Sequence, residues 1–486
     1  MNESKTFTYQ TRFNLEGLQG PIFNAYGKLH GSVERHLFEA LNKELPINTL
    51  KREYLLEHGI TARQFNAARV SVEGKIASVK ACHEEQMIQL KEKISSLEKK
   101  LPKIKNKEAR HQKNRKLVSM KLKLKQLEIA KKEASVAICF GGRKLFHAQY
   151  HLEKNGYDSF EEWKKDWEFA RSSEFFCIGS KDETAGNQSC VLTIDGNNRC
   201  QLRLRLPNAI QKTYGTKHLI ISDLSFNYGQ VEISQALLAK KALSYRFKQD
   251  EKGWRVFVSF SREKTSIVTE EALGGIGVDI NAEHLAVTEI DSKGNPIDKK
   301  TFPLCTYGKT TDQAKALIGD VCKEIVAFAK EKRKPIVAEK LDFKKKKATL
   351  KEESTPKLSR MLSSLSYSHI LENLERKAFQ EGVGFFTVNP ALTSIIGRIK
   401  FSKRYGLSTH HAAALCIVRR LFKFSEAPSK CPMKVVHKNI QVTCPLPARN
   451  RKQHVWTFWK EANRKLKATL AAFFRGSQGP QYSRSG

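Results

Sequence analysis

The chain has 486 residues, enough for roughly two to four domains, and a formal net charge of +36 from 86 Lys and Arg against 50 Asp and Glu. The basic residues occur along the whole length rather than in terminal runs, which favours a partner with many phosphates over a generally solvated surface. There is no stretch of about eighteen apolar residues and no signal-peptide hydrophobic region, which excludes a membrane-spanning helix and predicts a cytoplasmic protein.

The N-terminal part changes from a strand pattern to a helical one. Residues 6–14 alternate in the manner of a β-strand, and residues 21–80 are expected to be helical. The segment 61–70 presents guanidinium and amide side chains together, and such groups can pair with base edges or phosphates. The candidate nucleic-acid contacts in this segment are Arg63, Gln64 and Arg69. An ordinary surface helix accounts for each of them equally well.

The clearest periodic pattern lies in residues 84–134. Two runs of apolar residues spaced by three and four positions are separated by Pro102 and a basic tract at 103–115. The runs are Met87, Leu90, Ile94, Leu97 and Leu101, then Leu117, Met120, Leu124 and Leu127. This pattern predicts an antiparallel helical hairpin with a basic tip. A dimerisation coiled coil is the alternative, but the short arms and the charged tip favour contact with a nucleic acid.

From residue 175 to residue 260 the pattern is that of short strands, many of which alternate apolar with basic residues. Turn signals at 195–198 and 251–253 separate them. One face of these strands is expected to pack on a core while the other carries arginines outward. The outward arginines are Arg203, Arg205, Arg246 and Arg255.

An aspartate stands at the end of an apolar strand in residues 275–291. Asp279 ends the first strand, a short polar turn follows, and residues 285–290 resume the apolar pattern, so a β-hairpin is expected. A carboxylate in an apolar setting costs several kcal/mol unless charge or hydrogen bonds compensate it, and a metal ion is one such compensator. Taken alone, an aspartate at a strand end is more often a turn or cap residue.

A second acid, Glu339, ends the apolar strand that Pro335 opens. Apolar residues at helical spacing between Asp312 and Lys330 predict a helix between the two acidic strands. A hairpin, a crossover helix and an acidic strand are the skeleton of the RNase H-like fold.

Three motifs carry a resemblance to a known family. The segments Gly277-Val-Asp-Ile-Asn281, Ile336-Val-Ala-Glu339 and Val388-Asn-Pro-Ala-Leu-Thr-Ser394 resemble, in this order, the split RuvC nuclease of TnpB transposon proteins and small type V CRISPR effectors. The resemblance implies an α+β multidomain fold. The implied parts are a wedge β-barrel of the oligonucleotide-binding type at 1–20 and 171–268, a helical recognition lobe at 21–170, a RuvC nuclease domain at 269–425, and a basic tail at 426–486.

The third catalytic acid of that family is missing. Where the family has Asp-x-Asn-Ala-Ala, residues 408–415 read Ser-Thr-His-His-Ala-Ala-Ala-Leu, which puts His410 at the aspartate position. Imidazole is a common metal ligand, so His410 is the favoured candidate ligand beside Asp279 and Glu339, with its neighbour His411 as the second choice. Only one of the two can face a given ion, because consecutive helical residues point about 100° apart. Three alternatives stay open: a displaced carboxylate from Glu283, one from Asp342, or an inactive nuclease.

The resemblance also implies cofactors. A two-metal site of Mg²⁺ or Mn²⁺ is expected, with Mn²⁺ preferred because imidazole suits later divalent ions better than Mg²⁺. The ten cysteines include no Cys-x-x-Cys pair, and only residues 395–407 lie where relatives carry a zinc ribbon, so we expect buried thiols and no structural zinc. Cys431, Cys444 and His437 are the nearest approach to a metal cluster.

The function implied by the resemblance is RNA-guided DNA cleavage, with a guide RNA and double-stranded target DNA as partners and a prokaryotic cytoplasm, at the nucleoid when bound, as the location. A lysine run is expected to be either a solvated loop or a mobile lid over the incoming strand. It consists of Lys344, Lys345, Lys346 and Lys347. A guided DNA-binding protein without nuclease activity is the alternative function, and a guide-independent resolvase or transposase is a third.

Overall fold

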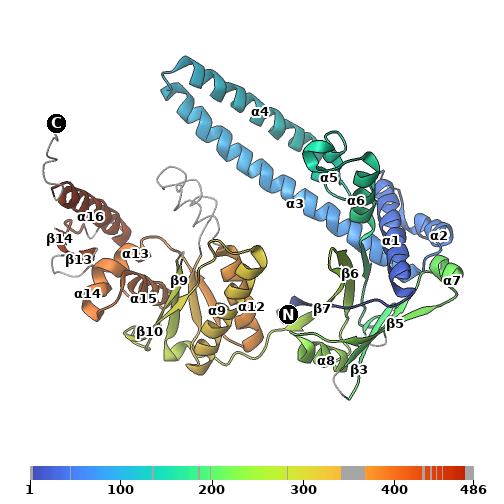
Figure 1. The fold of residues 1–486 in the computed structure, drawn as a ribbon. Helices are drawn as coiled ribbons and strands as arrows, with labels where there is room; N and C mark the ends of the chain where they lie inside the picture. Colours follow the sequence, from blue (N-terminus) through green and yellow to red (C-terminus); the bar gives the residue numbers. More distant parts are fainter. Residues whose placement is uncertain are drawn as a thin grey trace, which may run out of the picture. The chain divides into compact units, whose positions relative to one another are not determined.

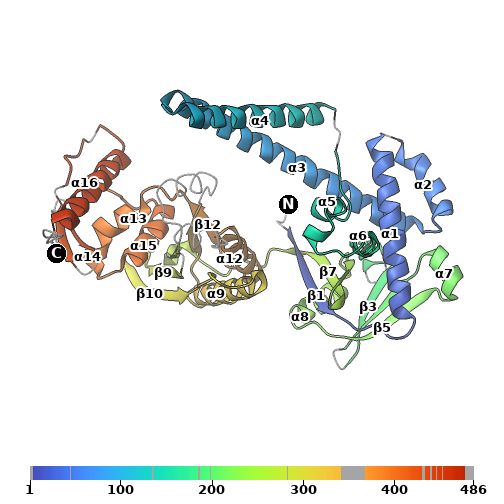
Figure 2. The same ribbon diagram turned by 45° about the horizontal axis from the view of Figure 1, so that its top comes forward.

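The computed structural model describes residues 4–43, 45–133, 136–183, 186–196, 199–281, 283–340, 367–428, 433–437, 440–444, 446–450 and 452–476. The chain divides into two compact units, one from Ser4 to Arg262 and one from Glu263 onward (Figures 1 and 2). Across the described ranges, every helix is too short or too polar to cross a membrane. The fold is α+β, as the sequence predicts, and its strands form several separate sheets.

Three helices open the first unit: α1 (Gln19–Asn42), α2 (Ile47–Glu57) and α3 (Ala62–Lys100). Their facing sides bury an apolar cluster that includes Leu37 and Phe65. The start of α3 is fixed by a capping box, in which Thr61 and Gln64 satisfy each other's backbone N–H groups.

The long α3 and the following α4 (Lys107–Lys132) form an antiparallel hairpin (Figure 1). Ion pairs join Glu84 to Lys131, Lys91 to Glu128 and Glu98 to Lys121, and their register requires that the two helices run in opposite directions. The turn occupies only residues 101–106, because the Asn106 side chain accepts a hydrogen bond from Ala109 N at 3.1 Å and starts α4 there. Most of the basic tract at 103–115 is therefore helical.

The strands of the first unit form two sheets. One has the order β1 (Ser4–Arg12), β7 (Gly253–Glu263), β6 (Ser244–Asp250), β2 (Glu174–Cys177). The other has the order β3 (Cys190–Ile194), β4 (Cys200–Arg205), β5 (His218–Leu224). The shorter elements of this unit are α5 (Arg143–Ala148), α6 (Phe160–Ser172), α7 (Asn208–Tyr214) and α8 (Gln230–Leu238).

The expected wedge barrel is corrected to these two sheets. Within the described residues no ladder of hydrogen bonds joins them, so they do not close into a barrel. They share instead one apolar core with α1, in which Phe23 of α1 contacts Phe247 and Trp254 edge to face. Alternation of buried and exposed residues along a strand predicts a packed face, but it cannot distinguish one closed sheet from two packed ones.

The second unit is built on a five-stranded sheet of order β10 (Pro296–Pro303), β9 (His284–Ile290), β8 (Gly275–Ile280), β11 (Ile336–Glu339), β12 (Phe385–Val388). Strands β8, β9 and β10 are antiparallel neighbours, whereas β11 runs parallel to β8 and β12. This topology is that of the RNase H-like fold. The sequence pattern predicts only the hairpin of β8 and β9 and not the neighbouring strand β10.

Helices cover both faces of this sheet (Figure 2). One core contains residues of β8 and β11 together with α9 (Thr311–Glu331) and α12 (Tyr367–Glu381). The other contains α15 (Thr409–Leu421) and α16 (Val455–Gly476). Gly277 permits the close approach of α15, because a Cβ there would collide with the Ala414 carbonyl. Shorter elements are α13 (Thr393–Ile396), a π-helical turn (Gly397–Phe401), α14 (Ser402–Tyr405), β13 (Met433–His437) and β14 (Ile440–Cys444).

A buried ion pair joins the start of β11 to β9. Lys334 Nζ lies 2.5 Å from Glu289 Oε1 and also donates to the Ile290 carbonyl at 2.9 Å, and both charged side chains are less than a tenth exposed. Lys334→Met leaves the Glu289 carboxylate buried without its partner, so we expect the free energy of unfolding to fall by about 3–5 kcal/mol. Chemical denaturation of the full chain measures the change.

The matched control is Lys330→Met. Lys330 pairs with Glu381 at a comparable 2.6 Å, but both side chains are about half exposed. An exposed pair contributes about 0–1 kcal/mol, so this variant is expected to unfold close to the parent chain. Equal losses in the two variants would show that burial does not set the cost.

Candidate active site

Two carboxylates stand at the ends of neighbouring parallel strands. Val278 of β8 is paired with Ala338 of β11, so Asp279 and Glu339 each follow the paired position by one residue. Both side chains lie within the fold, with 6% of Asp279 and 7% of Glu339 exposed. Carboxylates are seldom this buried unless charge or hydrogen bonds compensate them.

His410 lies against the first of these acids. Ser408 caps α15 by accepting a hydrogen bond from His411 N, and His410 in the first turn brings its Nδ1 to 3.2 Å from Asp279 Oδ2. Asn281 Nδ2 donates to the same oxygen at 3.0 Å. The His284 ring meets His410 edge to face at 5.0 Å, and burial, followed by the neighbouring His410, lowers the pKa of His284. The histidine at the position of the missing third acid thus contacts Asp279.

His411 points into a different environment. Its Nδ1 lies 2.8 Å from Ser408 Oγ, and its Nε2 lies 3.1 Å from the Lys300 carbonyl and 3.2 Å from Thr301 Oγ1. Both ring nitrogens are therefore in hydrogen bonds, which fasten α15 to β10 through Lys300 and Thr301. Consecutive helical residues differ by about 100° in direction, which is why only His410 faces Asp279.

Glu339 is held by a residue that the sequence reasoning did not select. The Thr393 hydroxyl donates to Glu339 Oε1 at 2.5 Å, and the Thr393 side chain is 1% exposed. Leu392, in the left-handed region with φ of 66°, begins the helix that carries Thr393. Tyr367 OH donates to the Glu339 carbonyl at 3.1 Å, and burial raises the pKa of Tyr367 far above its ordinary value. Thr393 belongs to the Asn-Pro-x-x-Thr motif, and this motif is the feature of the sequence that could have identified Thr393 as a functional residue.

The spacing of the three candidate ligands limits how they could bind metal. The ligand atoms of Asp279, Glu339 and His410 do not all lie within 4.8 Å of one another, although Asp279 and His410 are in contact. A single ion held by all three would need each ligand atom at about 2 Å from the ion. Two ions about 4 Å apart spread their ligands more widely, so this donor set fits a two-ion centre better than one ion.

Of the alternative acids and the other predicted groups, several lie outside the described residues. Glu283 lies in the turn between β8 and β9 with an exposed side chain. Asp342 and the lysine run at 344–347 lie outside the described residues. Cys431 also lies outside them, and the side chains of His437 and Cys444 are not described.

Three candidate nucleic-acid contacts in the first turns of α3 have partners within the protein. Gln64 is 5% exposed, its Nε2 donates to Tyr26 OH at 3.1 Å, and its side chain completes the capping box of α3. Arg63 pairs with Glu183, and Arg69 Nε lies 2.8 Å from Glu73 Oε1. The two arginines keep partial exposure.

The predicted arginines on the strands differ in exposure. Arg203 and Arg246 are exposed on β4 and β6, whereas Arg205 is half-buried. Arg246 lies over the Phe257 ring and 3.8 Å from Glu174. Arg255 is half-buried and pairs with Asp250. The exposed, basic part of this surface is therefore smaller than the sequence pattern suggested.

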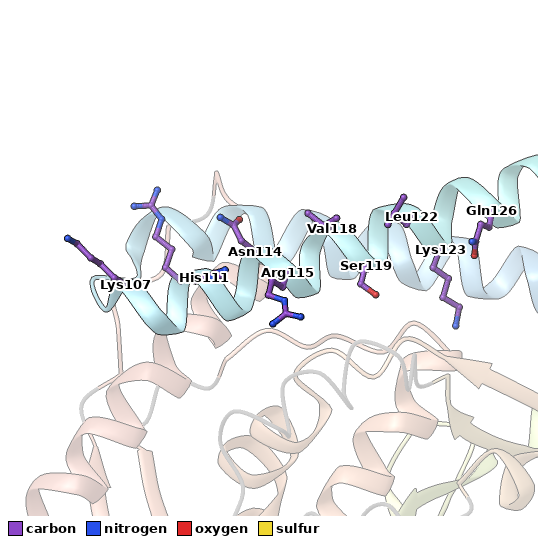
Figure 3. Close-up of a pocket in the computed structure, with 10 residues that line it drawn as sticks. Lys107, His111, Asn114, Arg115, Val118, Ser119, Leu122, Lys123 and Gln126 are labelled. Carbon is purple, nitrogen blue, oxygen red and sulfur yellow. The ribbon is translucent and has the colours of Figure 1, made fainter. Parts of the chain in front are cut away.

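An open basic groove lies along α4 (Figure 3). It is lined by Lys107, Arg110, His111, Asn114, Arg115, Val118, Ser119, Leu122, Lys123 and Gln126, which include no acid. In Figure 3 Arg115 and Lys123 extend downward from α4, and the exposed apolar residues Val118 and Leu122 lie along its upper side. Such a basic surface suits the backbone of a polyanion.

The chain matches no family model and no curated protein sequence. Its structure is similar to that of Cas12f1 in a complex with single guide RNA and target DNA, at 12% identity and a TM-score of 0.37, over 86% of this chain and 99% of that chain. RuvC of Thermus thermophilus is similar at 17% identity and a TM-score of 0.21, over 29% of this chain and 89% of that chain.

Cas12i1 in an R-loop complex after target DNA cleavage is similar at 9% identity and a TM-score of 0.29, over 76% of this chain and 56% of that chain. The similarity is thus to type V CRISPR effectors and to RuvC, the classes that the three sequence motifs resemble. All of these TM-scores are below 0.5, so the function is argued below from the chain's own residues.

Proposed function

We propose that the protein is an RNA-guided DNA endonuclease of the type V and TnpB kind, which cleaves target DNA by metal-dependent hydrolysis beside a short flanking motif. The observation that carries the proposal is the pair of buried carboxylates, Asp279 and Glu339, at adjacent parallel strand ends, with His410 Nδ1 3.2 Å from the first. The net charge of +36 also favours a partner that is rich in phosphates.

Each residue of the site has a separate role in this proposal. Asp279 and Glu339 hold two divalent ions, Mg²⁺ or Mn²⁺, and His410 assists at the Asp279 side. When bound, such ions activate water for attack on a phosphodiester and stabilise the leaving oxygen. Asn281 orients the Asp279 carboxylate and Thr393 orients that of Glu339 through the hydrogen bonds described above. The ligands are thereby fixed before metal or DNA arrives.

Binding of the guide RNA and the target duplex is assigned to the first unit and to the basic surfaces. The helices of residues 21–170 form the recognition lobe, the strands of 1–20 and 171–268 act as the wedge, and residues 269–425 act as the nuclease domain with the tail 426–486. Base pairing with the guide reads the target sequence, while the protein reads the flanking motif and the duplex shape. The groove on α4 is proposed to hold an RNA or heteroduplex backbone.

A second candidate function is guided DNA binding without cleavage. The observation that favours it is the imidazole of His410 where a third carboxylate would complete the site. The two functions share the guide and the target and differ only in the chemistry. A guide-independent resolvase has less support, because it gives no role to the α3–α4 hairpin and its basic groove.

The deciding experiment isolates the protein with its co-purifying RNA, sequences the RNA, and presents a duplex library that matches it. Cleavage is measured in Mg²⁺ and in Mn²⁺. Guide-dependent cuts support the endonuclease, and tight guide-dependent binding without cuts in either metal supports the second function. Binding or cutting that ignores the guide would overturn both.

Thr393→Val tests how Glu339 is positioned. The variant keeps the shape of the side chain but removes the hydroxyl that donates to Glu339 Oε1, so we expect the cleavage rate to fall by about tenfold. Thr393→Ser keeps the hydroxyl and should retain most of the rate. Single-turnover cleavage at saturating metal measures both, and equal rates in the Val variant and the parent would contradict the role.

Neutralising the α4 groove tests the RNA contact. Arg110→Gln with Arg115→Gln is expected to weaken RNA binding and to reduce the magnitude of the slope of log affinity against log salt by roughly 1.4–1.8, if each arginine neutralises one phosphate. Filter binding at several salt concentrations measures the slope. Lys91→Gln with Lys121→Gln is the control, because it removes equal charge from the same hairpin at residues paired with Glu128 and Glu98. Identical slopes in both double variants would show that the groove does not contact the RNA.

A further inference from the structure

A second group of metal-ligand side chains lies far from the nuclease residues in the sequence. His36 is on α1, and Glu57 and His58 are at the end of α2. In the described ranges these are the only three His, Cys, Asp or Glu residues whose ligand atoms gather within 4.8 Å of one another. His36 Nδ1 lies 3.3 Å from His58 Nε2, which in turn lies 3.9 Å from Glu57 Oε1.

These separations match the ligand spacing of tetrahedral zinc. At Zn–N distances of about 2.0–2.1 Å, two ligands at the tetrahedral angle are about 3.3 Å apart, as the two ring nitrogens already are. Two imidazoles with one carboxylate are a common donor set for Zn²⁺. We propose that His36, Glu57 and His58 form a binding site for one Zn²⁺ ion, with the fourth position open to water.

The surroundings of the cluster hold two of the three ligands in place. The His58 side chain is only 9% exposed, and its ring meets the Tyr54 ring edge to face at 5.3 Å, while the backbone N–H of His58 donates to the Tyr54 carbonyl at 3.1 Å. His36 stands on α1 one residue before the buried Leu37. The Glu57 side chain is 63% exposed and can turn toward the ion without repacking the core. The ion would therefore replace a histidine–histidine hydrogen bond with little movement.

A bound ion would tie α2 to α1 within the helices proposed to recognise the guide. The site does not depend on the proposed nuclease activity, since none of its residues belongs to that centre. The cysteine pattern could not reveal it, because its donors are two histidines and a glutamate from two helices. Without metal, the same residues are simply a hydrogen-bonded histidine pair with an exposed glutamate.

The test uses the full chain carrying Asp279→Ala, so that the nuclease centre does not compete for the ion. After treatment with a chelator, Zn²⁺ is titrated against a chromophoric competitor, and thermal unfolding is followed with and without the ion. The further variants are His36→Gln, Glu57→Gln and, as the control, His151→Gln. His151 is an exposed histidine of the same unit.

We expect one equivalent of Zn²⁺ to bind and to raise the unfolding temperature, with unchanged binding in the His151 control. His36→Gln should lower the affinity by at least about 100-fold, because even changes in the outer shell of a zinc site cost about 10–100-fold. Co²⁺ should give the intense visible bands of a four-coordinate ion, and His36→Gln should abolish them. Equal Zn²⁺ affinity in the His36 and His151 variants, or no bound equivalent in the starting chain, would overturn the site.

Discussion

Asp279→Ala is expected to reduce guided DNA cleavage by at least about a thousandfold. The substitution removes the carboxylate that the fold buries at the end of β8, together with the contact to His410 Nδ1 at 3.2 Å. Loss of one preorganised electrostatic group commonly costs about 10²–10³ in rate, and the remaining ligands would also hold the ions less well. Single-turnover cleavage of a guide-matched duplex measures the effect.

Target binding should survive this change, because pairing with the guide and contacts to the backbone supply the affinity. We expect the dissociation constant of the Asp279→Ala complex to stay within about twofold of the parent value. Asp279→Asn keeps the side-chain volume and should lose cleavage to a similar degree, which separates loss of charge from a packing defect. A folded Asp279→Ala chain that still cuts at the parent rate would show that this centre does not catalyse the cleavage.

Glu283→Gln is the matched control and also tests the displaced-carboxylate alternative. Glu283 lies four residues after Asp279, but its side chain is exposed in the turn before β9. The variant should cut like the parent chain. A loss comparable to that of Asp279→Ala would show that Glu283 supplies the missing third acid.

The sequence predicts the two buried acids well because strand pattern and strand ends are local properties. An apolar run that ends on a carboxylate specifies where that carboxylate emerges from the sheet, and the parallel pairing of β8 with β11 then brings Asp279 beside Glu339. The crossover helix follows from its spacing in the same way, with α9 at Thr311–Glu331 against an expectation of 312–330. Only the pairing of β8 with β11 is a contact between segments distant in the sequence.

Features that the sequence pattern leaves open depend on partners remote in sequence. Gln64 looked like a surface amide, but it occupies the N3 position of a capping box, which the Thr-x-x-Gln spacing could have indicated. The sequence favours His410 over His411, because consecutive helical residues point about 100° apart, and the structure turns His410 toward Asp279 and His411 toward Lys300. Closure of the strands into a barrel depends on edge pairing, which alternation along one strand does not encode.

His410→Asp is expected to reverse the metal preference of the enzyme. The parent chain should cut about tenfold faster in Mn²⁺ than in Mg²⁺, because it offers two carboxylates and an imidazole, and imidazole suits the later ion. An aspartate at this position restores three carboxylates and all-oxygen ligation, so the rate in Mg²⁺ should rise to match or exceed that in Mn²⁺. Cleavage rates across parallel titrations of the two metals measure the ratio.

Position 410 lies in the first turn of α15, where a negative charge is favourable by about 0.3–1 kcal/mol. The new carboxylate also faces Asp279, so the two charges repel without metal, and bound ions should stabilise this variant more than the parent chain. His410→Asn is the control, because it removes the imidazole without adding charge and should lower cleavage in both metals. If the parent chain cuts equally fast in both metals at every concentration, His410 does not act as a ligand. A His410→Asp variant that gains cleavage where the parent has none would instead show that loss of the third carboxylate had turned this nuclease into a guided binder.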